Sequence, residues 1–189
     1  MQLKFVRHAG LVLVLTVLCA CATLPRAAGP VIKGELDPRE YRYLELPNRM
    51  RVILVSDPAS DKAAASLQVR AGSGDDPEGR QGLAHFLEHL MFKGTSKHPV
   101  GEFSQTVLRI GGNENAFTSV DYTGYFQRVP REQLARMMEF EADRMTGLIL
   151  KDENVLPERD VVLEEFNMRV ANNPDARLTE QIMAALYLN

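Results

Sequence analysis

The feature that most constrains this chain is a triplet of reactive side chains within the segment GRQGLAHFLEHLMFKGT. His85, Glu88 and His89 stand at positions i, i+3 and i+4, so in a helix all three project from one face within about one turn. Two neutral imidazoles one turn apart can chelate a divalent ion, and zinc is the usual occupant of a site made of two histidines and a carboxylate. Glu88 would then be free to act as a base on a metal-bound water. The chain has to supply a third ligand from elsewhere.

Hydrophobic periodicity around the triplet predicts a helix over residues 79–93, which Gly94 is well placed to end. The triplet gathers on one arc of this helix, and the opposite arc is apolar, comprising Leu83, Phe86, Leu87, Leu90 and Met91. We therefore expect the helix to pack through the apolar arc and to present the triplet on the other side. This pattern alone fits either a metal site or a solvated polar face.

A second helical segment, within residues 152–173, contains the candidate third ligand. Its apolar arc encloses Glu158 and Glu165, whereas Glu164 falls on the solvated side. A carboxylate on a buried face is costly unless it is paired or bound to a metal, so Glu165 needs a partner. Arg169, four residues further on, is one candidate partner, and a metal held by the two histidines is the other.

The remaining chain reads as a mixture of strands and helices. Apolar alternation and turn residues predict strands over residues 41–46, 49–55, 63–71, 114–119 and 122–129. Helical periodicity predicts helices over residues 100–110, 131–150 and 174–189. In the helix over residues 131–150, a stripe that includes Met137, Met138 and Met145 is assigned to the core.

The first residues have the layout of a bacterial export signal rather than of folded structure. A basic start with Lys4 and Arg7 precedes an apolar run over residues 9–18, which is too short to span a membrane. We assign residues 1–22 to a signal peptide, and either lipidation at Cys21 or ordinary cleavage nearby fits the pattern. The protein is thus expected in the periplasm, or anchored to the outer membrane on its periplasmic side, with any membrane contact made through the lipid alone.

Composition limits the partners of the folded part. The net charge is −3 and no basic run is present, which argues against nucleic acid as a partner because phosphate binding requires clustered Lys and Arg. Residues 23–39 are rich in Ala, Pro and Gly and are interpreted as a linker. Residues 40–189 are interpreted as one domain.

Three separated motifs resemble the pitrilysin-like inverzincin family of zinc metallopeptidases, the relatives of insulin-degrading enzyme and mitochondrial processing peptidase. The first is His85-x-x-Glu88-His89. The second is ERDVVLEE, whose match to the family falls on Glu165, 76 residues beyond His89. The third is Asn115-Ala116-x-Thr118. Within the family, the chain resembles the bacterial envelope branch.

The resemblance implies an α+β fold, a largely antiparallel sheet with helices packed on it, here an N-terminal zinc peptidase domain that is incomplete at its C-terminus. It implies one Zn²⁺ held by His85, His89 and Glu165 and a catalytic Glu88. It also implies that Glu158 supports the site. The substrate strand would comprise Asn115, Ala116, Phe117 and Thr118.

The implied activity is endopeptidase cleavage of extended peptides or unfolded polypeptides, with a second homologous domain or subunit as partner. This chain alone is then expected to bind zinc and to hydrolyse peptides weakly or not at all. Two alternatives lie outside catalysis: a partner subunit that binds zinc without cleaving peptides, and an envelope lipoprotein that only binds peptides. Uptake of zinc distinguishes the peptide-binding lipoprotein from the others.

Overall fold

The computed structural model of the chain describes residues 29–33 and 37–187. The predicted signal peptide, with Cys21, lies outside these residues. Residue contacts divide the chain between Ala59 and Ser60 into two compact units. No helix within the described residues is both long and apolar enough to cross a membrane.

The first unit contains a three-stranded antiparallel sheet of β1 (Ile32–Lys33), β2 (Glu40–Glu45) and β3 (Arg51–Ser56), in that order. β2 and β3 form a hairpin, as predicted, and Arg49 takes a positive φ of 67° in its turn. β1 lies inside the stretch interpreted as a linker. Ile32 pairs with Tyr41, so part of that stretch belongs to the sheet.

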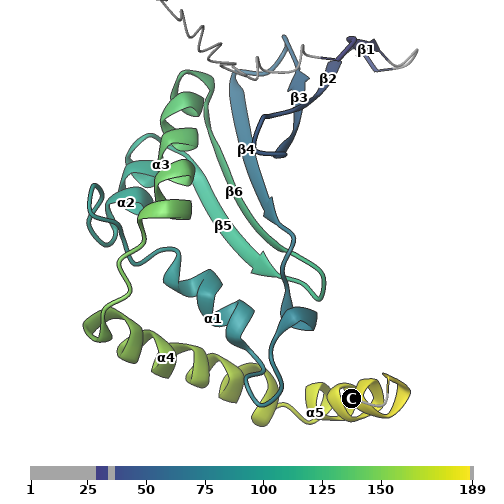
Figure 1. The fold of residues 1–189 in the computed structure, drawn as a ribbon, viewed down its shortest axis with the longest axis vertical. Coiled ribbons are helices and arrows are strands. Elements are labelled where there is room, and N and C mark those ends of the chain that lie inside the picture. Colours follow the sequence, from purple (N-terminus) through teal and green to yellow (C-terminus); the bar gives the residue numbers. More distant parts are fainter. Residues whose placement is uncertain (1–28, 34–36, 188–189) are drawn as a thin grey trace, which may run out of the picture. The chain divides into compact units, whose positions relative to one another are not determined.

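The second unit is built on the antiparallel sheet β4 (Lys62–Val69), β6 (Thr123–Pro130) and β5 (Asn113–Thr118), with β6 in the centre (Figure 1). Alternate residues of β6 are buried, among them Tyr125, Gln127 and Val129. Ala116 pairs with Tyr125 in register, so Ala116 and Thr118 share this covered face of the sheet. β5 is an edge strand among the described residues.

Helices cover that face. The helices are α1 (Leu83–Leu90), α2 (Glu102–Arg109), α3 (Leu134–Gly147), α4 (Asp152–Phe166) and α5 (Pro174–Tyr187), with 3-10 turns at Ser73–Asp75 and Arg131–Gln133 and a π-helical turn at Asn167–Ala171. α1, α2 and α3 pack on the sheet, and α4 packs on α1 (Figure 1). The predicted α+β class, with an antiparallel sheet and packed helices, is confirmed.

The core of the second unit lies between the sheet, α2 and α3. Its buried apolar cluster comprises Val107, Val129, Met137 and Phe140, with Phe103 and Ile110 packed against it. The predicted methionine stripe is therefore only partly correct. Met137 is fully buried, but Met138 and Met145 are about half exposed because the buried arc of α3 runs instead through Phe140, Glu141 and Arg144.

α1 is shorter than the predicted helix over residues 79–93. Gly82 precedes the helix with a φ of 92°, and Asp76 caps the start by accepting hydrogen bonds from the N–H groups of Gly82 and Ala84 at 2.7 and 2.8 Å. The helix ends at Leu90, before Gly94. Gly94 has a φ of 86° in the following loop, where a Cβ would lie 2.7 Å from the Val100 nitrogen.

Candidate metal centre

The reactive triplet lies on the inner side of α1, between the sheet and α4. Glu88 is only 8% exposed, and His85 and His89 are half-buried. The expectation that α1 packs only through its apolar arc is wrong, since Leu83 and Leu87 of that arc are 45% and 47% exposed. The packing of α4 against α1 turns the polar side inward, so the triplet is not a solvated face.

α4 brings its two glutamates to the same side of the helix. Glu158 and Glu165 are seven residues apart, about two helical turns, and both are turned inward. The predicted apolar arc of α4 is displaced in the structure, because Val161, Leu163 and Phe166 are about half exposed. The carboxylates, rather than these apolar side chains, occupy the face toward α1.

Three side chains converge as a candidate metal site. One ligand atom from each of His85, His89 and Glu165 lies within 4.8 Å of the others. His89 Nε2 is 3.4 Å from Glu165 Oε2, and His85 Nε2 is 3.9 Å from Glu165 Oε1. Ligands of a tetrahedral zinc ion are separated by roughly 3.3–3.6 Å. The donor types and their spacing therefore fit zinc after a small adjustment at His85.

Glu158 supports the second histidine. Its Oε1 lies 2.9 Å from His89 Nδ1, and its Oε2 forms an ion pair with Lys93 Nζ. Burial raises the pKa of Glu158, but hydrogen bonds from Lys93 and His89 outweigh this effect and hold the pKa below its usual value. The carboxylate is thus ionised at neutral pH and suited to accept a hydrogen bond from a protonated Nδ1 of His89. The other ring nitrogen, Nε2, is then left without a proton and is directed at Glu165.

Glu165 also contacts Arg169, so both of the partners that the sequence suggested for it lie nearby. Arg169 Nη1 lies 3.0 Å from Glu165 Oε1, but the arginine side chain is 77% exposed. Arg169 belongs to the π-helical turn that directly follows α4. Such an exposed pair contributes little stability, about 0–1 kcal/mol, and does not replace the two imidazoles as the reason for a buried carboxylate.

Glu88 is oriented by the sheet. Thr118 Oγ1 donates a hydrogen bond to Glu88 Oε2 at 2.6 Å. Thr118 belongs to the predicted substrate strand, and this contact with the carboxylate was not expected from the sequence. Asn115 and Phe117 lie on the opposite face of β5 from Thr118. A cavity of about 270 Å³ adjoins the site, lined by Glu88, His89, Phe92, Lys93, Asn115, Ala116 and Glu158.

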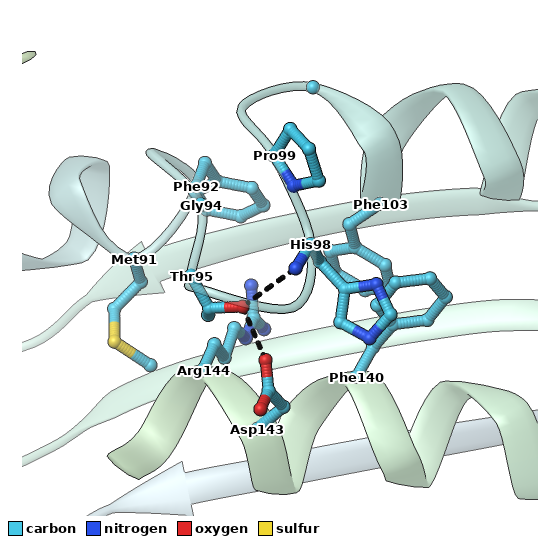
Figure 2. A pocket seen from close by; sticks show the side chains of 11 residues that line it. Met91, Phe92, Gly94, Thr95, His98, Pro99, Phe103, Phe140, Asp143 and Arg144 are labelled. Atoms are coloured by element: carbon cyan, nitrogen blue, oxygen red, sulfur yellow. Dashed lines mark hydrogen bonds between the residues drawn. The ribbon is translucent and has the colours of Figure 1, made fainter. Parts of the chain in front are cut away.

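A second, smaller pocket lies under the loop that follows α1 and contains none of the three ligands (Figure 2). Its Thr95 hydroxyl donates to Asp143 Oδ2 at 2.5 Å and accepts the N–H of His98 at 3.0 Å. Arg144 and Phe140 complete the wall of this pocket from α3. These contacts fix the loop on α3 and thereby fix the end of α1.

The sequence interpretation missed Lys93 as part of the site. A signal was available, because Lys93 stands four residues after His89, at a spacing that favours contact along a helix. Its partner could not be found this way, since Glu158 is on a different helix. Only the packing of α4 on α1 brings the two together.

Comparison with known proteins decides the family. Residues 51–189 match the model of the insulinase family, peptidase family M16. The chain belongs to this family. The resemblance to pitrilysin-type metallopeptidases is thereby confirmed, and family M16 comprises zinc-dependent peptidases.

Individual relatives agree with the family assignment. Insulin-degrading enzyme of Bos taurus is 46% identical over 59% of this chain and 11% of its own length. Zinc protease PqqE of Helicobacter pylori is 36% identical over 79% of this chain and 34% of its own length. The crystal structure of pitrilysin superposes with a TM-score of 0.69 at 34% identity, covering 77% of this chain and 16% of pitrilysin. The chain thus spans from about a tenth to a third of these family members.

Proposed function

We propose that this chain is the zinc-binding part of a metalloendopeptidase that hydrolyses extended peptides or unfolded polypeptides. The observation that carries the proposal is the convergence of His85, His89 and Glu165 beside a buried Glu88. Two histidines and one glutamate are a ligand set that leaves a coordination position open, as catalytic zinc sites require. Membership of family M16 supports the same chemistry.

In this proposal each residue has one task. His85, His89 and Glu165 would hold zinc, which when bound supplies a Lewis acid that acidifies a coordinated water and polarises the peptide carbonyl. Glu88 accepts the proton of the attacking water and returns it to the amine of the leaving peptide. The Thr118 hydroxyl, 2.6 Å from Glu88 Oε2, holds this carboxylate in place.

The edge of the sheet supports peptides as the substrate class. β5 has a strand neighbour on one side only among the described residues, so its free edge can pair with an extended peptide backbone. Asn115 and Ala116 of β5 also line the cavity beside Glu88. Strand addition selects extended conformation more than sequence, which suits cleavage of unfolded polypeptides.

We further propose that a homologous domain or subunit completes the enzyme. α4 and α5 carry many apolar side chains that are about half or more exposed, namely Leu156, Val161, Leu163, Phe166, Leu178, Ile182, Met183, Leu186 and Tyr187. So many exposed apolar side chains on two successive helices favour a surface that another domain or chain covers. The expected result is that the chain alone binds zinc but shows little turnover, and robust peptide hydrolysis by the purified chain would contradict it.

The decisive experiment separates metal binding from proton transfer. Glu165→Ala should lose zinc, whereas Glu88→Gln should retain zinc and, in the complete enzyme, lower kcat by about 10²- to 10⁴-fold. Zinc content is measured by atomic absorption and activity with a fluorogenic peptide. A parent chain that takes up no zinc would favour a protein that only binds peptides, and equal zinc content and activity in both variants would refute the assigned roles.

A further inference from the structure

Lys93 is a half-buried charged residue for which the proposed reaction has no direct use. Its Nζ forms an ion pair with Oε2 of Glu158, and its side chain is 26% exposed. The other oxygen of the same carboxylate, Oε1, lies 2.9 Å from His89 Nδ1. The Glu158 carboxylate is therefore held at both oxygens, by an ammonium at one and an imidazole at the other.

We propose that Lys93 is a positioning residue for the zinc ligand His89 and acts through Glu158. The inference rests on the proposed function, because it takes His89 as a ligand. Lys93 lines the cavity beside β5 but is assigned no part in the reaction itself. Its task is to keep the Glu158 carboxylate turned toward His89.

The two nitrogens of His89 face different partners, which gives this orientation its importance. Nδ1 faces Glu158, while Nε2 lies 3.4 Å from Glu165 Oε2. A carboxylate that accepts the Nδ1 proton selects the tautomer whose Nε2 lone pair is free for a metal. If Glu158 rotates away, both the tautomer and the ring orientation of His89 lose their support.

The surroundings of Glu158 leave Lys93 as its main anchor. The Glu158 side chain is only 10% exposed, so its charge depends on polar partners to compensate for its burial. A neutral side chain at position 93 would leave Oε2 without the cation that now compensates its burial. A buried carboxylate that has lost its cation is strongly disfavoured and is expected to rotate toward solvent.

Lys93 is itself held firmly by the backbone. Its N–H donates to the carbonyl of Leu90 at 3.0 Å, within the turn that ends α1. The next residue, Gly94, accepts a hydrogen bond from the N–H of Ile149 at 3.3 Å, and Thr95 is bonded to Asp143 (Figure 2). Contacts with α3 thus fix the loop, the loop fixes Lys93, and Lys93 fixes a carboxylate of α4.

The test is zinc affinity of the full chain, measured by competition with a chromophoric chelator at neutral pH. Lys93→Met is expected to weaken zinc binding by about tenfold, the lower end of the loss seen when a residue supporting a metal ligand is removed. Lys93→Arg keeps the charge and is expected to recover most of the affinity. Cobalt-substituted protein should show an altered visible spectrum for Lys93→Met, because the orientation of His89 changes.

Lys151→Met is the matched control. It removes the same charge, but Lys151 is 64% exposed and pairs with Glu153 at the start of α4 instead. Its zinc affinity is expected to equal that of the parent chain. An equal loss in Lys93→Met and Lys151→Met would overturn the proposal, because it would reduce the effect to net charge.

A double-mutant cycle tests whether Lys93 acts through Glu158. In a Glu158→Gln background, Lys93→Met is expected to have no further effect on zinc affinity. A full tenfold loss in that background would overturn the proposal. Circular dichroism and thermal unfolding of the metal-free variants report folding, and Lys93→Gln, which keeps an uncharged donor, carries the test should Lys93→Met fail to fold.

The outcomes separate this inference from the proposed function. A parent chain that binds no zinc would refute the metal site and this inference with it. A parent chain that binds zinc, with Lys93→Met and Lys93→Gln binding equally well, would refute the role of Lys93 alone. Weaker zinc binding in these two variants, cancelled by Glu158→Gln, is the supporting result.

Discussion

At the scale of single residues, the contact between Thr118 and Glu88 links the sheet to the proposed base. A hydrogen bond to a charged group contributes about 1.5–3 kcal/mol, so losing it should cost at least about tenfold in rate if it holds Glu88 in its reactive position. Thr118→Val is expected to lower kcat/KM of the complete enzyme by about tenfold or more and to leave zinc content unchanged. Thr118→Ser, which restores the hydroxyl, should recover activity, and unchanged activity in Thr118→Val would contradict the role.

Arg169 offers a test of the simpler interpretation of Glu165. If Glu165 is inward because two imidazoles and a metal require it, the exposed Arg169 pair is incidental and worth about 0–1 kcal/mol. Arg169→Met should then change zinc affinity by less than about fivefold in a chelator competition assay. Loss of zinc binding in this variant, matching that in Glu165→Ala, would show that Arg169 and not the metal site keeps Glu165 in place.

Residue patterns could single out the candidate ligands because each histidine and glutamate lies in a locally periodic segment, but periodicity left Arg169 as an alternative partner of Glu165. The spacing of His85 and His89 depends only on helix geometry, whereas the apolar arc that was expected to bury Glu165 is itself about half exposed on α4. The bond from Thr118 to Glu88 and the pair of Lys93 with Glu158 depend on the packing of separate elements. Periodicity within one segment contains no information about such contacts.

At the scale of elements, a buried polar cluster ties α3 to the sheet. Arg144 donates two hydrogen bonds to Glu141, at 2.8 and 2.5 Å, and Glu141 also accepts one from Gln127 of β6. The guanidinium lies 4.6 Å from the ring of Tyr125. The sequence analysis did not place Arg144 on the inner face of α3, because an arginine side chain is ordinarily expected to lie in solvent.

Removing this cation should destabilise the fold. Arg144→Met leaves Glu141 buried without its partner and is expected to lower the free energy of unfolding by about 3–5 kcal/mol. Arg136→Met, on the exposed side of the same helix, should cost less than about 1 kcal/mol. Urea unfolding followed by circular dichroism measures both, and equal effects would show that the cluster contributes no more than a surface charge.

The stability that the loop between α1 and α2 gives to the fold should depend on pH through Asp143. The Thr95 hydroxyl, and after it the Lys97 ammonium, holds the pKa of Asp143 below its ordinary value of 3.8 against the opposing effect of burial. A lowered pKa stabilises the fold above the ordinary value, and the stabilisation is lost as the pH falls through the lowered pKa. Thr95→Val should therefore be less stable than the parent at pH 7, and the difference should narrow below about pH 4 in urea unfolding. If the difference in free energy of unfolding between the two proteins widens in acid, the assigned direction of the Asp143 pKa shift is wrong.

At the scale of the whole molecule, the sequence allowed the fold class and the order of strands and helices from β2 onward to be predicted, but not β1 or which helix faces are covered. Leu163 of α4 and Ile182 of α5 are apolar and about half exposed, although periodicity alone would assign them to a core. A periodic pattern shows that a face is apolar and does not show which molecule covers it. The same limit applies to α1, whose polar side is buried because α4 packs over it.

Zinc should couple these packed elements, because its proposed ligands come from α1 and α4, far apart in the sequence. A ligand that binds only the folded state adds about 2.7 kcal/mol of stability at a concentration of one hundred times its Kd. Adding zinc to the metal-free chain should therefore raise its Tm, and a chelator should reverse the rise. The rise should vanish in Glu165→Ala, which lacks a ligand, and persist in Glu88→Gln, which keeps all three. Equal zinc-dependent shifts in both variants would place the stabilising ion elsewhere in the molecule.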